Sequence, residues 1–158
     1  MTPSEPADDA FRAVRAAEIL DSYRRLLGRD LIPRSGDAAE DARRLFDLPL
    51  GVLAHDTSPA PLLDWANLAA ARAFDATPES LLGRPSAATA PADAVADRHA
   101  LFDVLARQGF VTGYSGVRVS LTGRRFVIDD VTVLEVRDAA GRPAGHAAVI
   151  GATRPAGR

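Results

Sequence analysis

Residues 108–136 read QGFVTGYSGVRVSLTGRRFVIDDVTVLEV, and this stretch decides the fold of the chain. Two segments rich in β-branched residues flank the sequence LTGR at residues 121–124, which has glycine in its third position. Apolar residues that alternate on both sides of a glycine turn are typical of a β-hairpin. In the second segment both sets of alternate positions are apolar, so we expect this strand to be covered on both faces and to lie centrally in its sheet.

The two-residue period of a β-strand assigns the hairpin side chains to faces. In the first strand we expect Val117, Val119 and Leu121 to lie in the main core. The opposite face of that strand would carry Tyr114, Arg118 and Ser120. In the second strand, one face would carry Phe126, Ile128, Thr132, Leu134 and Val136, and the other Val127, Val131 and Val133.

The composition indicates a single soluble domain. The chain has 158 residues, of which 47% are hydrophobic and 25% charged, and its net charge is −2. These proportions are ordinary for a globular domain, and no basic patch indicates nucleic acid as a partner. The chain has no cysteine. This excludes disulfides, thiolate metal sites and cysteinyl–flavin adducts.

Neither a targeting segment nor a membrane span is predicted. Residues 1–9, MTPSEPADD, are polar and acidic, unlike a secretory signal. No apolar run approaches the roughly 20 residues that a membrane-spanning helix needs. We therefore expect a cytoplasmic protein that does not bind membranes.

The N-terminal third of the chain is expected to be helical. After a disordered segment, residues 1–9, a helix is predicted over residues 10–27, ending at Gly28. Its apolar stripe consists of Ala16, Ile19, Leu20, Tyr23, Leu26 and Leu27. This stripe would pack either on the sheet or on the same helix of a second chain. Asp37 and Glu40 have the spacing of a capping box for a second helix that ends at Phe46.

The remaining elements predict an α+β fold. Strands are expected over residues 51–55, 62–66 and 145–150, in addition to the hairpin. Helices are expected over residues 68–74, capped by Asn67, and over residues 79–82 and 93–107. Such an order gives an antiparallel sheet with the helices grouped on one face.

Two segments carry a resemblance to a known family. Residues 51–56, GVLAHD, and 62–86, LLDWANLAAARAFDATPESLLGRPS, resemble the opening of a PAS domain. Residues 107–136 are more specifically similar to the MEKHLA family of PAS-like domains, which occurs alone in bacterial proteins and at the C-terminus of plant homeodomain–leucine-zipper factors. The similarity covers about residues 46–150, and residues 26–29 also resemble bacterial members.

The resemblance implies a five-stranded antiparallel sheet with helices packed on one side, a sensing or dimerisation role and no known catalytic residues. It divides the chain into an N-terminal helical extension, residues 1–45, a PAS-like domain, residues 46–152, and a tail, residues 153–158. It also implies that the chain is of the stand-alone bacterial type.

A candidate pocket follows from the polar and aromatic residues of the PAS-like part. Its members are Trp65, Asn67, Phe74, Arg98, His99, Phe102, Tyr114, Arg118 and Phe126. Each has a structural alternative: Trp65 and Phe74 as core aromatics, Asn67 as a helix cap, and Arg98 as a partner of Asp93 or Asp97. Tyr114 and Arg118 line the pocket if their face meets the domain's helices, and have a structural role if it meets the N-terminal helix.

The sequence assigns no cofactor. His99 has the position of a haem ligand in haem-binding PAS domains, but a single histidine at the edge of an apolar arc is also typical of a half-buried surface residue. Flavin and haem both stay open. The segment GYSGV at residues 113–117 lacks the last glycine of a nucleophile elbow, and His55–Asp56 is a lone pair with no metal-binding cluster. We therefore expect no enzyme and no metal site.

These observations predict a sensory or regulatory module that binds a small apolar or amphipathic molecule between sheet and helices. The signal would leave through the N-terminal helix, to a second copy of the chain or to another protein. Two alternatives remain: a ligand-free interaction or dimerisation module, and a small α+β enzyme.

Overall fold

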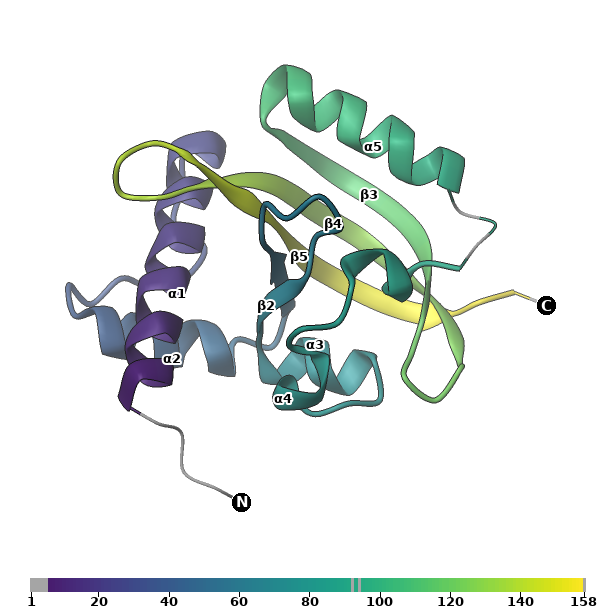
Figure 1. Ribbon diagram of the computed structural model, residues 1–158, viewed down its shortest axis with the longest axis horizontal. Helices are drawn as coiled ribbons and strands as arrows, with labels where there is room; N and C mark the ends of the chain where they lie inside the picture. The colour runs from purple at the N-terminus through teal and green to yellow at the C-terminus, as the bar shows by residue number, and fades with distance from the viewer. Residues whose placement is uncertain (1–5, 92, 94, 158) are drawn as a thin grey trace.

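The structure, a computed structural model, describes residues 6–91, 93 and 95–157; the side chains of residues 6–8 and 95–98 lie outside the description. In the described part of the chain, five strands form one antiparallel sheet in the order β2-β1-β5-β4-β3 (Figure 1). The strands are β1 Gly51–His55, β2 Leu63–Ala66, β3 Phe110–Val119, β4 Arg125–Arg137 and β5 Pro143–Pro155. The predicted α+β fold with a five-stranded antiparallel sheet is confirmed.

Helices cover both faces of this sheet (Figure 1). On one face lie α1 Pro6–Leu27 and α2 Ala38–Asp47. On the other lie α3 Leu68–Ala73, α4 Pro78–Leu81, the 3-10 helix η1 Ser86–Thr89 and α5 Val95–Gln108. The helices of the PAS-like part are thus grouped on one face as predicted, and the two N-terminal helices occupy the other.

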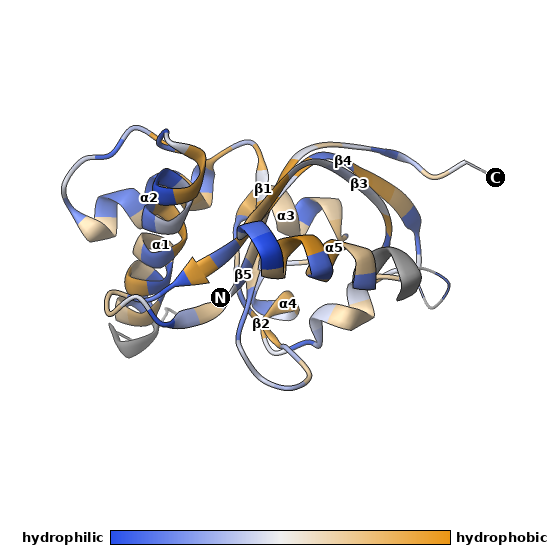
Figure 2. Ribbon diagram, turned by 90° about the horizontal axis from the view of Figure 1, so that it is seen from above, coloured by the Kyte–Doolittle hydropathy of each residue, from blue (hydrophilic) through white to orange (hydrophobic). Residues whose placement is uncertain are grey.

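The two layers of helices give two cores, with the hydrophobic strands between them (Figure 2). The first core, on the α1 side, contains Ala16, Ile19, Leu20, Tyr23, Ile32, Leu45, Val52, Ala54, Trp65, Leu134, Val136, Ala147 and Val149. The second core, on the α5 side, contains Leu53, Leu63, Ala66, Ala70, Ala71, Phe74, Leu81, Leu105, Phe126, Ile128, Val131, Val133 and Ile150. Strand β4 contributes to both cores, as its doubly apolar sequence predicts.

The hairpin of β3 and β4 has the predicted turn. The backbone N–H of Ser120 donates to the carbonyl of Arg124 at 2.9 Å. Gly123 has a φ of +84°, a conformation that glycine adopts without steric cost. The turn is tied to the end of α3, because Arg124 and Thr122 both donate hydrogen bonds to the carboxylate of Asp75.

The predicted assignment of side chains to the two faces of the sheet is wrong in both strands of the hairpin, β3 and β4. In β3, Leu121 is exposed, whereas Ser120 is buried and Arg118 and Tyr114 lie on the side of the second core. The reason is the register: Arg118 lies opposite Phe126, and residues opposite each other in neighbouring strands share a face.

In β4, Phe126 and Ile128 belong to the second core, and Leu134 and Val136 to the first. Asp130 lies between these pairs and has a φ of +50°. This single left-handed residue interrupts the alternation, so the apolar positions on its two sides point to opposite faces.

Asn67 holds several elements together from a fully buried position. Its side-chain oxygen accepts hydrogen bonds from the N–H of Ala70, which caps α3 as predicted, and of Val52 in β1. Its amide nitrogen donates to the carbonyls of Leu45 in α2 and of Leu48 and Leu50 in the connection to β1. A buried amide with this many partners fixes local geometry strongly.

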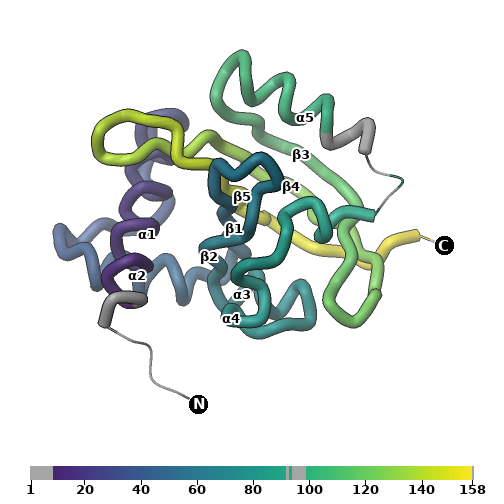
Figure 3. Tube along the Cα trace, viewed as in Figure 1, coloured from purple at the N-terminus to yellow at the C-terminus, as the bar shows by residue number. Residues whose placement is uncertain are grey.

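Helix α1 begins at Pro6, earlier than the predicted residue 10, because proline is well tolerated in the first turn of a helix. The helix lies beside the β4–β5 hairpin (Figure 3), and the N–H of Arg137 in β4 donates to the hydroxyl of Ser22 at 2.9 Å. Its predicted apolar stripe is confirmed: Ala16, Ile19, Leu20 and Tyr23 are buried against the sheet.

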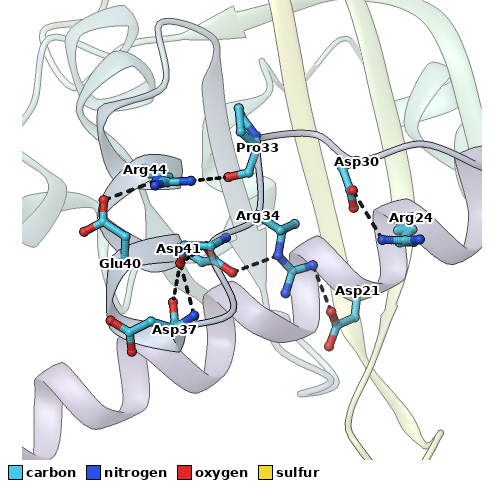
Figure 4. A network of polar contacts seen from close by, with 10 residues as sticks. Asp21, Arg24, Asp30, Pro33, Arg34, Asp37, Glu40, Asp41 and Arg44 are labelled. Carbon is cyan, nitrogen blue, oxygen red and sulfur yellow. Dashed lines mark hydrogen bonds and ion pairs between the residues drawn. The ribbon is translucent and has the colours of Figure 1, made fainter.

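The connection from α1 to α2 is held by Arg34 (Figure 4). Its guanidinium donates to Asp21 of α1 at 3.0 Å and to Asp41 of α2 at 2.9 Å. Hydrogen bonds from Arg34 and from Ser35 lower the pKa of the Asp41 carboxyl from 3.8 to about 2. The predicted capping box is wrong: Asp37 makes no side-chain cap bond, and Glu40 instead pairs with Arg43 and Arg44.

Candidate functional site

A cavity of about 80 Å³ lies between the sheet and the helices of the second core. Its walls are mainly apolar and include Leu53, Phe74, Leu101, Phe102, Val133 and Ile150. Its polar lining consists of His55, Ser86, Thr89, Arg118 and His146. An apolar pocket with a few polar groups is the usual form of a small-molecule site, although most such sites are larger, about 300–1,000 Å³.

One end of the cavity is formed by three rings. His55 of β1 and His146 of β5 are partners in the strand register, and their ring centroids are 5.1 Å apart. Phe102 of α5 packs edge-on against His146 at 5.3 Å and lies 6.3 Å from His55. The helix α5 therefore meets the sheet at this histidine pair.

Arg118 contributes a positive charge to the cavity from β3. Its guanidinium donates to the carbonyl of Val117 at 2.8 Å and to the hydroxyl of Tyr114 at 3.4 Å, and it lies over the Tyr114 ring. Gly116 leaves the necessary space, because an added Cβ would lie 2.6 Å from the Tyr114 hydroxyl and 2.9 Å from the Arg118 guanidinium. Arg118 makes no ion pair with a carboxylate among the side chains that the structure describes.

His55 faces both sides of the sheet. Its ring lines the cavity, while its carbonyl oxygen accepts a hydrogen bond of 2.8 Å from Arg15 of α1. Gly145 of β5 packs directly on this carbonyl: an added Cβ would lie 1.8 Å from the oxygen, and the φ of Gly145 is +99°. Helix α1 and the cavity therefore meet through one residue of β1.

Arg15 is buried, and it binds two carboxylates as well as the His55 carbonyl. It donates to Asp64 of β2 at 3.2 Å and to Glu18 at 3.1 Å. Burial raises the pKa of the Asp64 carboxyl, and the guanidinium of Arg15 opposes this shift. A buried cation needs such partners, because an uncompensated charge in the interior is costly.

The structure brings some of the predicted pocket residues together and separates others. Phe74, Phe102 and Arg118 line the cavity, and Phe126 and Tyr114 pack in or against the same core. Trp65 lies in the first core, where its ring N–H donates to the carbonyl of Arg12. Asn67 is a cap, His99 is exposed on α5, and the side chain of Arg98 lies outside the described residues.

His55 and His146 were missed as pocket residues. His55 was considered only together with its neighbour Asp56, and His146 was not considered. The available signal was the alternation within each strand, but their contact depends on the pairing of strands that are about ninety residues apart in sequence. Local patterns do not give that pairing.

The site does not fit flavin or haem. A space of about 80 Å³ accommodates only a small molecule, and the chain has no cysteine for a flavin adduct. His99, the candidate haem ligand, is exposed and absent from the cavity wall. Among the described residues there is also no cluster of three or more metal-binding side chains, and no helix has the length and apolar character needed to cross a membrane.

Comparison with known proteins agrees with this architecture. A family model described as the MEKHLA domain matches residues 13–154, and thus includes most of α1. Curated protein sequences give no match.

Among solved structures, the chain resembles the PAS domain of a protein from Colwellia psychrerythraea, with 13% identity, a TM-score of 0.62, and coverage of 76% of this chain and 98% of the other. It also resembles an RNA-binding light-oxygen-voltage receptor, with 23% identity, a TM-score of 0.63, and coverage of 75% of this chain and 34% of that longer chain. A third similar structure is the PAS domain of a LuxR-family transcriptional regulator from Burkholderia thailandensis, in complex with ethanol. The identity is 17%, the TM-score is 0.54, and the match covers 68% of this chain and 92% of the other. At these identities the likeness concerns the fold.

Proposed function

The chain belongs to the MEKHLA domain family, and from this premise we propose that it is a sensory module that receives a small molecule in the cavity of the second core and passes the effect to α1. The PAS-like fold and the family support a sensory or regulatory role. The ligand and the output through α1 are the parts that this proposal adds.

The observation that carries the proposal is the double role of His55. A molecule in the cavity would contact its ring, together with Phe102 and His146. Movement of His55 changes the position of the carbonyl that binds Arg15, and thereby the hydrogen bond that anchors α1. A ligand that binds the two positions of His55 with different affinity shifts their populations.

The size and lining of the cavity favour a small ligand with both apolar and polar parts. The Burkholderia thailandensis PAS domain of the same fold is in complex with ethanol, a small molecule with an apolar and a polar part. Larger cofactors would require the helices of the second core to move outward, which would expose apolar surface.

The surface around α1 supports an output through protein contact. Phe11 and Val14 of α1 are exposed large hydrophobic residues, at 52% and 59% of their full accessibility. A groove of about 390 Å³ is lined by residues of α1, α2, β2 and α4 that include Arg12, Phe46 and Trp65. A shift of α1 would change this groove, which a second copy of the chain or another protein would contact.

The experiment uses Trp65, the single tryptophan of the chain, as a reporter of α1. Ala148 lines the cavity from β5, and Ala148→Leu fills part of the space without touching the first core. We expect this variant to change the emission of Trp65. The matched control, Ala152→Leu, adds the same atoms to an exposed position of the same strand and should leave the emission unchanged.

An emission spectrum of Ala148→Leu that equals that of the wild type and of Ala152→Leu would contradict the proposal, provided that circular dichroism shows all three to be folded. In that case the ligand-free interaction module becomes the better account.

A further inference from the structure

We propose that the cavity binds a small monocarboxylate with an apolar body, and that Arg118 binds its carboxylate. This inference rests on the proposed function, because it names the class of molecule that the same cavity receives. It follows from the charge of the cavity wall, from the order of its side chains along the sheet, and from its size.

Arg118 is an arginine of the cavity wall, and none of the described residues supplies a carboxylate that pairs with it. Other inward-facing arginines of the chain have carboxylate partners: Arg15 binds Asp64, and Arg34 binds Asp41. Within the described part of the chain, Arg118 donates to a carbonyl and a phenol, two neutral acceptors. A guanidinium has five N–H donors and binds a carboxylate in a two-pronged geometry, so an anion in the cavity would complete its coordination.

The order of residues along the sheet defines the rest of the ligand. Leu53 lies opposite Ala148, and His55 lies opposite His146 two residues further along the same pair of strands. In the neighbouring pair of strands, Arg118 of β3 lies opposite Phe126 of β4. Ile128 lies two residues further along β4. The apolar floor therefore lies between the arginine and the histidine pair. A ligand that reaches both has its charge at one end, an apolar body, and its far end at the rings.

The size of the cavity sets the length of this molecule. About 10–15 Å³ of such space holds one water molecule, so the observed 80 Å³ corresponds to roughly five to eight non-hydrogen atoms. A carboxylate of about six carbon atoms meets this requirement. A phosphate ester fits the charge of the cavity less well, because its doubly charged group calls for more than one cation.

The test is isothermal titration calorimetry of the full chain with hexanoate and with 1-hexanol, which has the same chain length and no charge. We expect hexanoate to bind the wild type at least tenfold more tightly than hexanol does. Arg118→Gln should weaken hexanoate at least tenfold and leave hexanol unchanged, and Arg118→Lys should show an intermediate loss. Arg125→Gln, which removes an exposed arginine of β4, is the matched control and should bind as the wild type does.

Equal affinity for hexanoate and hexanol in the wild type, or no binding of either, overturns the inference. Undiminished hexanoate binding by Arg118→Gln also overturns it. If Arg118→Gln does not fold, the wild type and Arg118→Lys decide the question. The Trp65 experiment with Ala148→Leu needs no ligand, so the sensory proposal stands or fails separately from this choice of molecule.

Discussion

At the scale of single residues, Gly145 sets the distance between β5 and the end of β1. It packs on the His55 carbonyl, to which Arg15 of α1 is bound, and its φ of +99° is unfavourable for other residues. No larger side chain fits at this position unless β1 or α1 moves.

Gly145→Ala should therefore destabilise the protein by at least about 3 kcal/mol, from backbone strain together with the collision with His55. Gly141→Ala is a matched control, because Gly141 also has a positive φ, of +80°, but an added Cβ there meets nothing within 4 Å. The control should cost about 1–2 kcal/mol from strain alone. Urea unfolding followed by Trp65 fluorescence measures both; equal losses would show that the contact with His55 is not tight.

Asp41 is the residue that makes stability depend on acid. Its carboxyl has a pKa of about 2 in the folded protein, against 3.8 ordinarily, because Arg34 and Ser35 bind its charged form. Between these two pH values the folded protein binds fewer protons than the unfolded chain, so stability falls as the pH falls.

Asp41→Asn should abolish this part of the acid sensitivity, which amounts to about 2 kcal/mol between pH 4 and pH 2. At pH 7 the variant should be less stable than the wild type by a similar amount, and the two should converge near pH 2. Asp21→Asn removes the exposed partner of the same Arg34 and should change stability by less than about 1 kcal/mol. Parallel pH profiles of wild type and Asp41→Asn, from denaturant unfolding, would contradict this role.

At this scale, the sequence predicts the residue roles that depend on contacts between near neighbours in the chain. Asn67 was predicted as a cap because a cap bonds to a residue three positions later. The pairing of His55 with His146 and the link from His55 to Arg15 join distant parts of the chain, and no local pattern encodes them.

At the scale of elements, α1 is held to the sheet by an apolar stripe and by a few polar anchors. Ile19 and Leu20 are fully buried in the first core, and Val14, on the outer side of the same helix, is mostly exposed. The stripe was predicted from its helical period, since burial on one face leaves that period in the sequence.

Ile19→Ala should cost about 2–5 kcal/mol, as is usual for a buried aliphatic side chain. Val14→Ala, in the same helix, should change stability by about 0.5 kcal/mol or less. Thermal or urea unfolding distinguishes these outcomes. A similar small effect of both substitutions would mean that α1 does not pack on the sheet in solution.

The elements themselves were largely predictable, and their faces were only partly so. The hairpin turn, the Asn67 cap of α3 and the strand β1 follow from local residue types, whereas the predicted capping box of α2 does not form. The faces of β4 did not follow, because the positive φ of Asp130 reverses the alternation in mid-strand. Aspartate is tolerated in this conformation but does not require it, so the sequence gives no clear signal.

At the scale of the whole molecule, one sheet separates two cores of different character. The first core joins α1 and α2 to the sheet, and the second contains the cavity. Residue His55 belongs to both environments, through its carbonyl on one side and its ring on the other. Under the proposed function, a change on the α5 side would reach the α1 side through this residue, with the sheet intact.

The central claim is that the cavity and α1 are coupled, and a double-mutant cycle measures that coupling directly. Ala148→Leu perturbs the cavity, and Arg15→Lys removes the guanidinium whose Nη2 donates to the His55 carbonyl. The unfolding free energies of both variants and of the double variant are measured in urea. If Ala148→Leu moves His55 away from Arg15, their hydrogen bond is already weakened. Arg15→Lys then lowers the unfolding free energy by less than it does in the wild type. The account therefore predicts that the double variant loses at least about 1 kcal/mol less than the sum of the single losses; losses that add within about 0.5 kcal/mol would contradict it.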